Sequence, residues 1–174
     1  MENKNLLLTL VVIAAFVLTS ATLMLPDEPK SKKGEVTWLT FENGLAAAKK
    51  DKKLMVVDFY TDWCGWCKKM DKDTYGDSSV IEFARKKLVL VKVNAESNEK
   101  TRFREQDYTY RQLAQAFGVS GYPATAFIDS TGEVLTLVEG YLTAGKFLPI
   151  LEFLEGGHHK TTKFEDYLAK RNKS

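Results

Sequence analysis

The sequence has only two cysteines and two histidines among its 174 residues. A scaffold held together by disulfides normally has several cysteine pairs, so this chain is not of that kind. Zinc needs four ligands, and the adjacent His158 and His159 lie far along the chain from the cysteines, which argues against a zinc site. Covalent haem attachment requires a histidine directly after the second cysteine, and Lys68 at that position excludes it.

A strong excess of either charge is also missing, since the formal net charge is only +2. A dedicated nucleic-acid-binding protein would show a basic face or stripe, so we expect no nucleic-acid partner. The lysine pairs at residues 49–50 and 86–87 are better explained by solvated helix faces. The apolar fraction of 44% is normal for a globular protein, and the length suits one folded domain.

One long apolar run is present, because residues 6–25 contain no charge. A bilayer-spanning helix needs about 20 such residues, and the short preceding head carries Lys4, which favours an export signal or an uncleaved membrane anchor. A buried core helix is the alternative, and the lysines at residues 30–33 count against export. The sequence thus predicts a signal peptide or anchor over 1–25, a linker over 26–34, a folded domain over 35–157 and a C-terminal extension over 158–174.

The apolar patterning predicts alternating strands and helices. Strands are expected at residues 36–39, 54–60, 88–94, 124–129 and 133–139, the last two forming a hairpin. Helices are expected at residues 41–50, 65–72, 80–86, 110–117, 143–155 and 164–170. The expected N-caps are Thr40, Thr143 and either Ser78 or Ser79. Residues 95–110 match neither pattern, and we interpret them as a surface insertion rather than a partner-binding loop.

Two of the expected strands, at residues 54–60 and 88–94, are almost continuously apolar. Such runs are typical of strands covered on both faces, as in a parallel sheet between helices. Because strands and helices also alternate along the chain, the sequence predicts an α/β fold with a mixed central sheet flanked by helices.

Cys64 and Cys67 are separated by two residues, between an expected strand and an expected helix. The thiolate is the attacking species in disulfide exchange, and a helix N-terminus favours it through its partial positive charge and free N–H groups. Cys67 lies one helical turn further along. Cys64 can therefore attack a partner disulfide, and Cys67 can resolve the mixed disulfide. Two inert buried cysteines are the alternative.

Two separated segments resemble the thioredoxin family. Residues 57–68, Val-Asp-Phe-Tyr-Thr-Asp-Trp-Cys-Gly-Trp-Cys-Lys, are similar to its strand and active-site turn. Residues 117–125, Phe-Gly-Val-Ser-Gly-Tyr-Pro-Ala-Thr, are similar to its second signature. The resemblance covers residues 36–154, extends to exported thioredoxin-like proteins and to the thioredoxin-like domain of bacterial thiol–disulfide interchange proteins, and implies the thioredoxin fold.

The resemblance implies a role for each matching residue of the first segment. Cys64 matches the exposed nucleophile, Cys67 the resolving thiol, and Asp58 the buried acid that helps to move the proton of the resolving thiol. A carboxyl in an apolar strand is desolvated, which raises its pKa and makes it a usable base. A partly exposed strand residue is the alternative for Asp58. The Gly65-Trp66 spacer departs from the Gly-Pro of thioredoxin, and in this family the spacer tunes the redox poise.

The second segment supplies residues that the resemblance implies for substrate binding. Pro123 matches a proline that follows a cis peptide bond and faces the dithiol, with a simple strand-start proline as the alternative. A cis bond there presents the backbone of Tyr122 to an extended substrate, as in strand addition. Trp63 and Trp66, on either side of Cys64 and Gly65, are expected to form an apolar rim for partners, although packing is the alternative for Trp63.

Together these inferences predict a thiol–disulfide oxidoreductase that acts on protein disulfides or dithiols and needs no metal or organic cofactor. We expect a monomeric reductase in an exported, periplasmic or extracytoplasmic compartment. A membrane electron donor would supply its electrons, and the N-terminal segment would anchor it if that segment is not cleaved. The alternatives are a non-catalytic thioredoxin-fold binding or chaperone module and a redox sensor.

Overall fold

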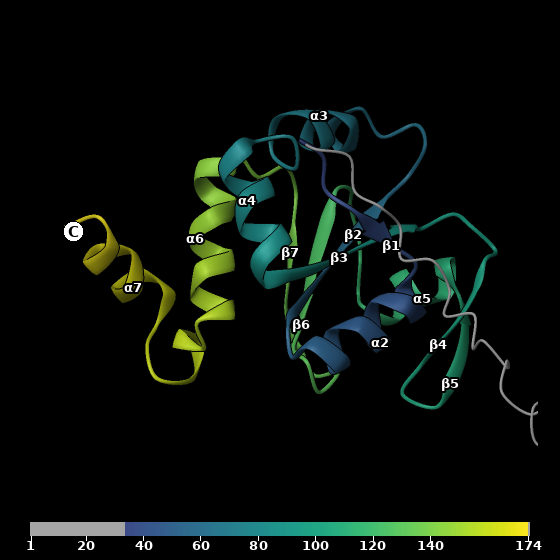
Figure 1. The fold of residues 1–174 in the computed structure, drawn as a ribbon. Helices are drawn as coiled ribbons and strands as arrows, with labels where there is room; N and C mark the ends of the chain where they lie inside the picture. The colour runs from purple at the N-terminus through teal and green to yellow at the C-terminus, as the bar shows by residue number, and fades with distance from the viewer. Residues whose placement is uncertain (1–33, 174) are drawn as a thin grey trace, which may run out of the picture.

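The computed structural model describes residues 34–173 (Figure 1). Its strands are β1 (Trp38–Leu39), β2 (Leu54–Tyr60), β3 (Leu88–Asn94), β4 (Lys100–Phe103), β5 (Gln106–Thr109), β6 (Ala124–Ile128) and β7 (Val134–Glu139). Its helices are α2 (Phe41–Asp51), α3 (Gly65–Asp73), α4 (Ser78–Lys87), α5 (Tyr110–Ala116), α6 (Ala144–Glu155), the 3-10 helix η1 (His158–Lys160) and α7 (Phe164–Arg171). The predicted elements occur in the predicted order, and the β4–β5 hairpin and η1 are additional.

Five strands form the central sheet in the order β1-β3-β2-β6-β7. Strands β1 and β2 run parallel to β3, whereas β6 is antiparallel to β2 and β7 is antiparallel to β6. The two almost continuously apolar strands, β2 and β3, therefore lie side by side in the interior of the sheet. The predicted α/β fold with a mixed central sheet flanked by helices is confirmed.

Each face of the sheet is covered by its own layer of helices (Figure 1). Alternate residues of a strand point to opposite faces. Met55 and Val57 of β2 accordingly pack in one cluster with residues of α2 and α5. Leu54 and Val56 pack in the other cluster with residues of α3, α4 and α6. Asp58 continues the second set, so this alternation directs its side chain toward the α3 side of the sheet.

The helix N-caps agree with the sequence at one position and differ at another. Thr40 caps α2 through its hydroxyl, as predicted. The prediction that Ser78 or Ser79 caps α4 is wrong, because Asp77 is the N-cap. The carboxylate of Asp77 accepts hydrogen bonds from the N–H of Ser79 at 2.9 Å and the N–H of Val80 at 3.2 Å. One carboxylate thus satisfies two of the free N–H groups of the helix, and both serines lie within its first turn.

The start of β1, the end of β6 and the hydrogen bonding of one cap also differ from the prediction. Strand β1 is shorter than the expected 36–39, because only its two residues pair with β3. Strand β6 ends before Asp129, whose carboxylate accepts hydrogen bonds from the N–H groups of Thr131 at 2.8 Å and Glu133 at 3.0 Å and so forms the turn. Thr143 occupies the N-cap position of α6 as expected, but its side chain makes no capping hydrogen bond.

Residues 95–110, interpreted from the sequence as a surface insertion, contain the β4–β5 hairpin. Phe103 of β4 is buried and contacts the rings of Phe41 and Phe117, with centroids 5.5 Å apart in each pair. Exposed and buried residues alternate along β4. The hairpin is therefore attached to the α2 and α5 layer through one face, which explains its mixed composition.

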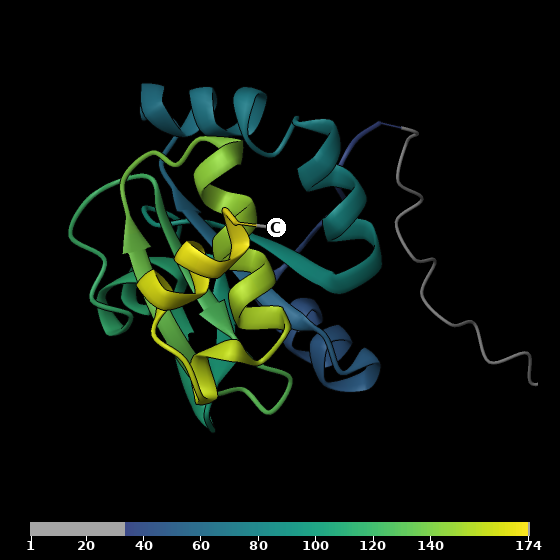
Figure 2. The same ribbon diagram turned by 90° about the vertical axis from the view of Figure 1, so that its left-hand side faces the viewer.

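The C-terminal segment from residue 158 onward packs along the outer side of α6 (Figure 2). The ring of Phe153 on α6 contacts the rings of Phe164 and Tyr167, with centroid distances of 5.1 and 5.3 Å. Arg171 donates a hydrogen bond from Nε to Glu152 at 2.6 Å. These contacts attach α7 to the α6 layer of the domain.

The predicted signal peptide or anchor over residues 1–25 and nearly all of the predicted linker lie outside the described residues. Among residues 34–173, none of the helices combines the length and the hydropathy that a membrane span requires. The described residues do not test the signal peptide or anchor, which therefore stays a prediction.

Gly44 of α2 marks a close approach of this helix to the sheet, because a Cβ at that position would lie 2.1 Å from Cγ2 of Val91 on β3. We expect Gly44→Ala to lower the free energy of unfolding by about 1–3 kcal/mol through overpacking. Helix propensity alone would predict that this substitution raises the free energy of unfolding by about 1 kcal/mol. Urea denaturation measures the difference.

Gly145→Ala is the matched control, since Gly145 also lies in a helix and, apart from its chain neighbours and that helix's backbone, no described atom lies within 4 Å of its Cβ position. This variant is expected to be as stable as the wild type or slightly more stable. If Gly44→Ala were equally stable, the close packing of α2 on β3 would be refuted.

Candidate active site

The two cysteines lie where β2 ends and α3 begins. Cys64 occupies the N-cap position of α3 with extended backbone angles. The N–H of Cys67 donates a hydrogen bond to Sγ of Cys64 at 3.0 Å. The two residues form a disulfide, with their Cα atoms 5.3 Å apart. Because the first N–H groups of a helix have no partner within the helix, the sulfur of Cys64 acts as the cap.

Exposed aromatic side chains border this disulfide. Cys64 and Cys67 are only 3% and 2% exposed, whereas Trp63 and Trp66 are 67% and 59% exposed. These tryptophans are the exposed large hydrophobic side chains of residues 34–173. Gly65 between them is also exposed, and apart from its chain neighbours and its own helix backbone no described atom lies within 4 Å of its Cβ position. Exposed tryptophans that cluster on a surface are typical of binding sites.

Three further loops meet the two tryptophans. The ring of Trp63 makes an edge contact with Tyr122, at a centroid distance of 6.1 Å. Its Nε1 donates a hydrogen bond to Oε1 of Glu96 at 3.0 Å. The ring of Trp66 contacts Tyr141, at a centroid distance of 5.5 Å. The active-site turn therefore lies beside the loops that follow β3, precede β6 and follow β7.

The peptide bond between Tyr122 and Pro123 is cis, as the resemblance implied. Pro123 is buried and directly precedes β6, whose first residue pairs with Phe59 near the end of β2. This antiparallel pairing places Tyr122 and Pro123 at the same edge of the sheet as the dithiol. Within residues 34–173, the backbone N–H and C=O of Tyr122 make no hydrogen bond.

Asp58 is a buried carboxyl in the middle of an apolar strand. It is 1% exposed, and its Oδ1 has no hydrogen-bond partner among the described residues. Desolvation raises its pKa from 3.8 to about 7, while the charge of Lys92 lowers it and that of Asp71 raises it to smaller extents. The predicted burial of Asp58 is confirmed. A carboxyl with a pKa near 7 can take up and release a proton at neutral pH.

Lys92 of β3 connects Asp58 to the dithiol helix. Its Nζ lies 3.5 Å from Oδ2 of Asp58 and forms an ion pair with Asp71 of α3. The same Nζ lies 4.8 Å from the ring centroid of Trp38 and 5.1 Å from that of Tyr60. Two carboxylates and two aromatic faces thus surround one ammonium group.

The structure brings the residues that the sequence predicted for the site to one edge of the sheet. They are Asp58, Trp63, Cys64, Gly65, Trp66, Cys67, Tyr122 and Pro123. Sequence reasoning missed Lys92, Asp71, Glu96 and Tyr141. Lys92 left a signal, since it is the one charged residue in the apolar run of β3. Its pairing with Asp58 depends on the register of two parallel strands, which the sequence does not specify.

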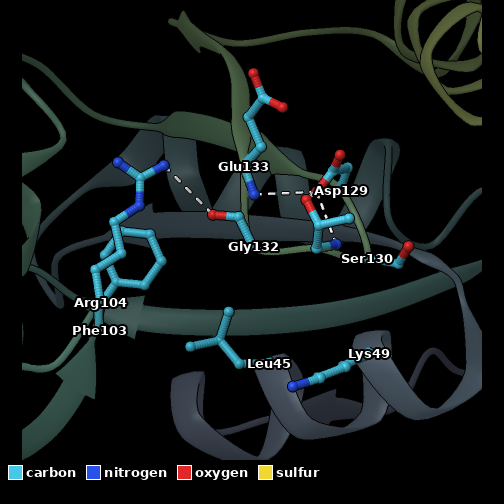
Figure 3. Close-up of a pocket in the computed structure, with 9 residues that line it drawn as sticks. Leu45, Lys49, Phe103, Arg104, Asp129, Ser130, Gly132 and Glu133 are labelled. Atoms are coloured by element: carbon cyan, nitrogen blue, oxygen red, sulfur yellow. Dashed lines mark hydrogen bonds between the residues drawn. The ribbon is translucent and has the colours of Figure 1, made fainter.

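A pocket of about 410 Å³ lies elsewhere, between α2 and the turns of the two hairpins (Figure 3). Arg104 donates a hydrogen bond to the carbonyl of Gly132 at 3.4 Å across it. Its lining residues are Leu45, Lys49, Phe103, Arg104, Asp129, Ser130, Thr131, Gly132 and Glu133. The lining contains neither cysteine and none of the residues around them, so this pocket is separate from the candidate active site.

A cysteine pair at the N-terminus of a helix, on a mixed sheet of this topology, defines the class of proteins with the thioredoxin fold. A comparison with known families agrees, because the model of the Thioredoxin-like domain family matches residues 41–155 of this chain. The chain belongs to the Thioredoxin-like domain family.

The chain is also similar to individual proteins and solved structures. The thiol:disulfide interchange protein DsbD of Haemophilus ducreyi is 31% identical over 139 residues, which are 78% of this chain and 22% of that protein. A thioredoxin-fold protein from Helicobacter pylori superposes with a TM-score of 0.61 at 24% identity, covering 71% of this chain and 81% of the other. For the C-terminal domain of DsbD from Neisseria meningitidis the TM-score is 0.51 at 24% identity, with coverages of 66% and 97%.

The chain spans about a fifth of the length of the curated relatives it matches. The structural likeness confirms the thioredoxin fold that the sequence resemblance implied.

The raised pKa of Asp58 predicts a pH-dependent stability. Unfolded, this carboxyl ionises with a pKa near 3.8, but in the folded protein it keeps its proton up to about pH 7. The folded state therefore holds more protons between these values, and the free energy of unfolding falls as the pH rises through that window. We expect Asp58→Asn to remove this slope and to be up to about 4 kcal/mol more stable than the wild type at pH 8.

Urea denaturation of the oxidised protein at pH 5 and pH 8 measures this effect. Asp62→Asn, which changes an exposed carboxyl in the turn that follows β2, is the control and is expected to keep the wild-type slope. Equal slopes for the wild type and Asp58→Asn would contradict the prediction.

Proposed function

We propose that this chain exchanges disulfides with protein partners through Cys64 and Cys67. The observation that carries the proposal is the hydrogen bond from the N–H of Cys67 to Sγ of Cys64 at the start of α3. In the reduced protein the same N–H and the partial positive charge of the helix would stabilise a thiolate at Cys64. Cys67, one turn away, is in place to attack the same sulfur.

In the proposed reaction, the thiolate of Cys64 attacks one sulfur of a partner disulfide, and the other partner sulfur leaves as a thiolate. Asp58 accepts the proton of Cys67, and the new thiolate attacks Sγ of Cys64. The bond to the partner breaks, its second sulfur leaves as a thiolate, and the Cys64–Cys67 disulfide forms. The partner gains two electrons. A pKa of about 7 suits Asp58 to this proton transfer.

Partner binding is proposed for the surface around the dithiol. The exposed rings of Trp63 and Trp66 offer apolar contact on both sides of Cys64, and Gly65 leaves room for a chain to approach. The backbone groups of Tyr122, next to Pro123, make no hydrogen bond among residues 34–173 and can pair with an extended segment of the partner, as in strand addition.

We further propose that the chain works as a monomeric reductase in an exported, periplasmic compartment and receives electrons from a membrane donor. Two observations support this. The relatives that it matches are named thiol:disulfide interchange proteins, and the apolar run over residues 6–25 has the composition of an export signal or anchor.

A pair of cysteine variants tests the exchange reaction. Cys67→Ser cannot resolve the mixed disulfide, so it is expected to retain partner proteins covalently, to be identified by mass spectrometry after non-reducing electrophoresis. Cys64→Ser is expected to fold but to lose insulin reduction completely, because the attacking sulfur is gone. A double variant without either thiol controls for non-covalent capture.

The same variants separate the alternative functions. If Cys64→Ser handled partners as the wild type does, a binding or chaperone module would be favoured. A wild type that is oxidised reversibly but does not turn over insulin would be a redox sensor. Recovery of no covalent partner with Cys67→Ser under oxidising conditions would contradict exchange.

The direction of exchange is tested by the reduction potential of the pair. We expect equilibration with glutathione to give a value well below the roughly −120 mV of strong oxidants. Trp66→Pro, which creates the spacer of thioredoxin, is expected to move it toward about −270 mV, and proline is tolerated in the first turn of a helix. A wild-type potential near that of strong oxidants would show that the chain forms disulfides instead.

A further inference from the structure

A single carboxylate holds the loop that carries Tyr122. Glu139, the last residue of β7, accepts hydrogen bonds from the N–H of Ser120 at 2.6 Å and from the N–H of Gly121 at 3.1 Å. The hydroxyl of Ser120 donates to its two oxygens at 3.0 and 2.9 Å. The N–H and hydroxyl of Ser120, and then the N–H of Gly121, lower the pKa of Glu139. These hydrogen bonds are therefore charge-assisted at neutral pH.

A second hydrogen bond fixes the other side of the same loop. The N–H of Gly140 donates to the carbonyl of Pro123 at 2.7 Å, and Glu139 itself pairs with Ala124 across the β6–β7 ladder. The end of β7 thus anchors the loop on both sides of Tyr122. Between these anchors, the N–H and C=O of Tyr122 make no hydrogen bond within the described part of the chain.

We infer that Glu139 is a positioning residue for partner binding: it holds Ser120 and Gly121 so that the backbone of Tyr122 is ready to pair with an extended partner segment beside the dithiol. The inference rests on the proposed function, because it needs a partner that reacts at Cys64. Glu139 acts through the loop and does not itself contact the partner. A backbone that is already in place loses less conformational entropy on binding.

The placement of Tyr122 makes the loop relevant to the reaction. Its ring contacts Trp63, the residue directly before Cys64, and β6 continues from the loop alongside β2. A partner strand that pairs with Tyr122 therefore runs next to the dithiol. A loop free to move would weaken this pairing without changing the two sulfur atoms.

Glu139→Ala tests the inference through a comparison of two substrates. With insulin, and dithiothreitol as the reductant, KM is expected to rise about tenfold while kcat and the reduction potential stay unchanged. With a small aromatic disulfide reagent, which has no peptide backbone, the rate is expected to equal that of the wild type. Glu139→Gln keeps an acceptor oxygen but not the charge, so an intermediate KM for insulin is expected.

Glu133→Ala is the matched control, because this exposed glutamate directly precedes β7 and its side chain makes no hydrogen bond or ion pair among the described residues. It is expected to keep the wild-type KM. An unchanged KM for insulin in folded Glu139→Ala, or an equal loss with both substrates, would overturn the inference.

If Glu139→Ala does not fold, Glu139→Gln decides by the same criterion: a raised KM for insulin alone supports positioning, and an unchanged KM refutes it. A wild-type protein inactive toward both substrates would overturn the proposed function, and this inference with it.

Discussion

The N–H of Cys67 faces the sulfur of Cys64, the N-cap of α3, and the helix is held against the sheet at two points. Met70 on the buried side of α3 packs in the same cluster as Val56 of β2. The ion pair between Asp71 and Lys92 ties the exposed side of the helix to β3. A helix fixed in this way keeps its first N–H groups directed at one atom. The stabilisation of a thiolate at Cys64, on which the proposed exchange depends, follows from this arrangement.

The charges beneath α3 couple this chemistry to the stability of the fold. Asp58 is buried by the same packing that fixes the helix, and desolvation moves its pKa to about 7. The ammonium group of Lys92 lies close enough to offset part of the desolvation cost of ionising Asp58, but it also pairs with Asp71. A carboxyl that is costly to ionise is a poor stabiliser and a suitable proton acceptor. Functional sites commonly contain residues that lower the stability of the fold in this way.

The surface around the dithiol combines adaptable and fixed parts. Trp63 and Trp66 present apolar rings that any partner with an apolar segment can contact. The loop before β6 adds backbone groups at Tyr122, and Glu139 at the end of β7 fixes the residues that precede them. Apolar side chains and free backbone groups thus lie next to each other in the site, since the ring of Trp63 contacts Tyr122, and a proposed partner can use both kinds of contact.

The sequence by itself determined the order of the strands and helices, the α/β class and the position of the dithiol, because apolar periodicity and the Cys-x-x-Cys spacing are local signals. It missed the β4–β5 hairpin, since Phe103 reveals its role only by packing on Phe41. Only the tertiary structure decided that Lys92 lies beside Asp58 and that Glu139 holds Ser120. Such contacts depend on strand register and on loops that approach one another across the sheet, which residues distant in sequence fix jointly.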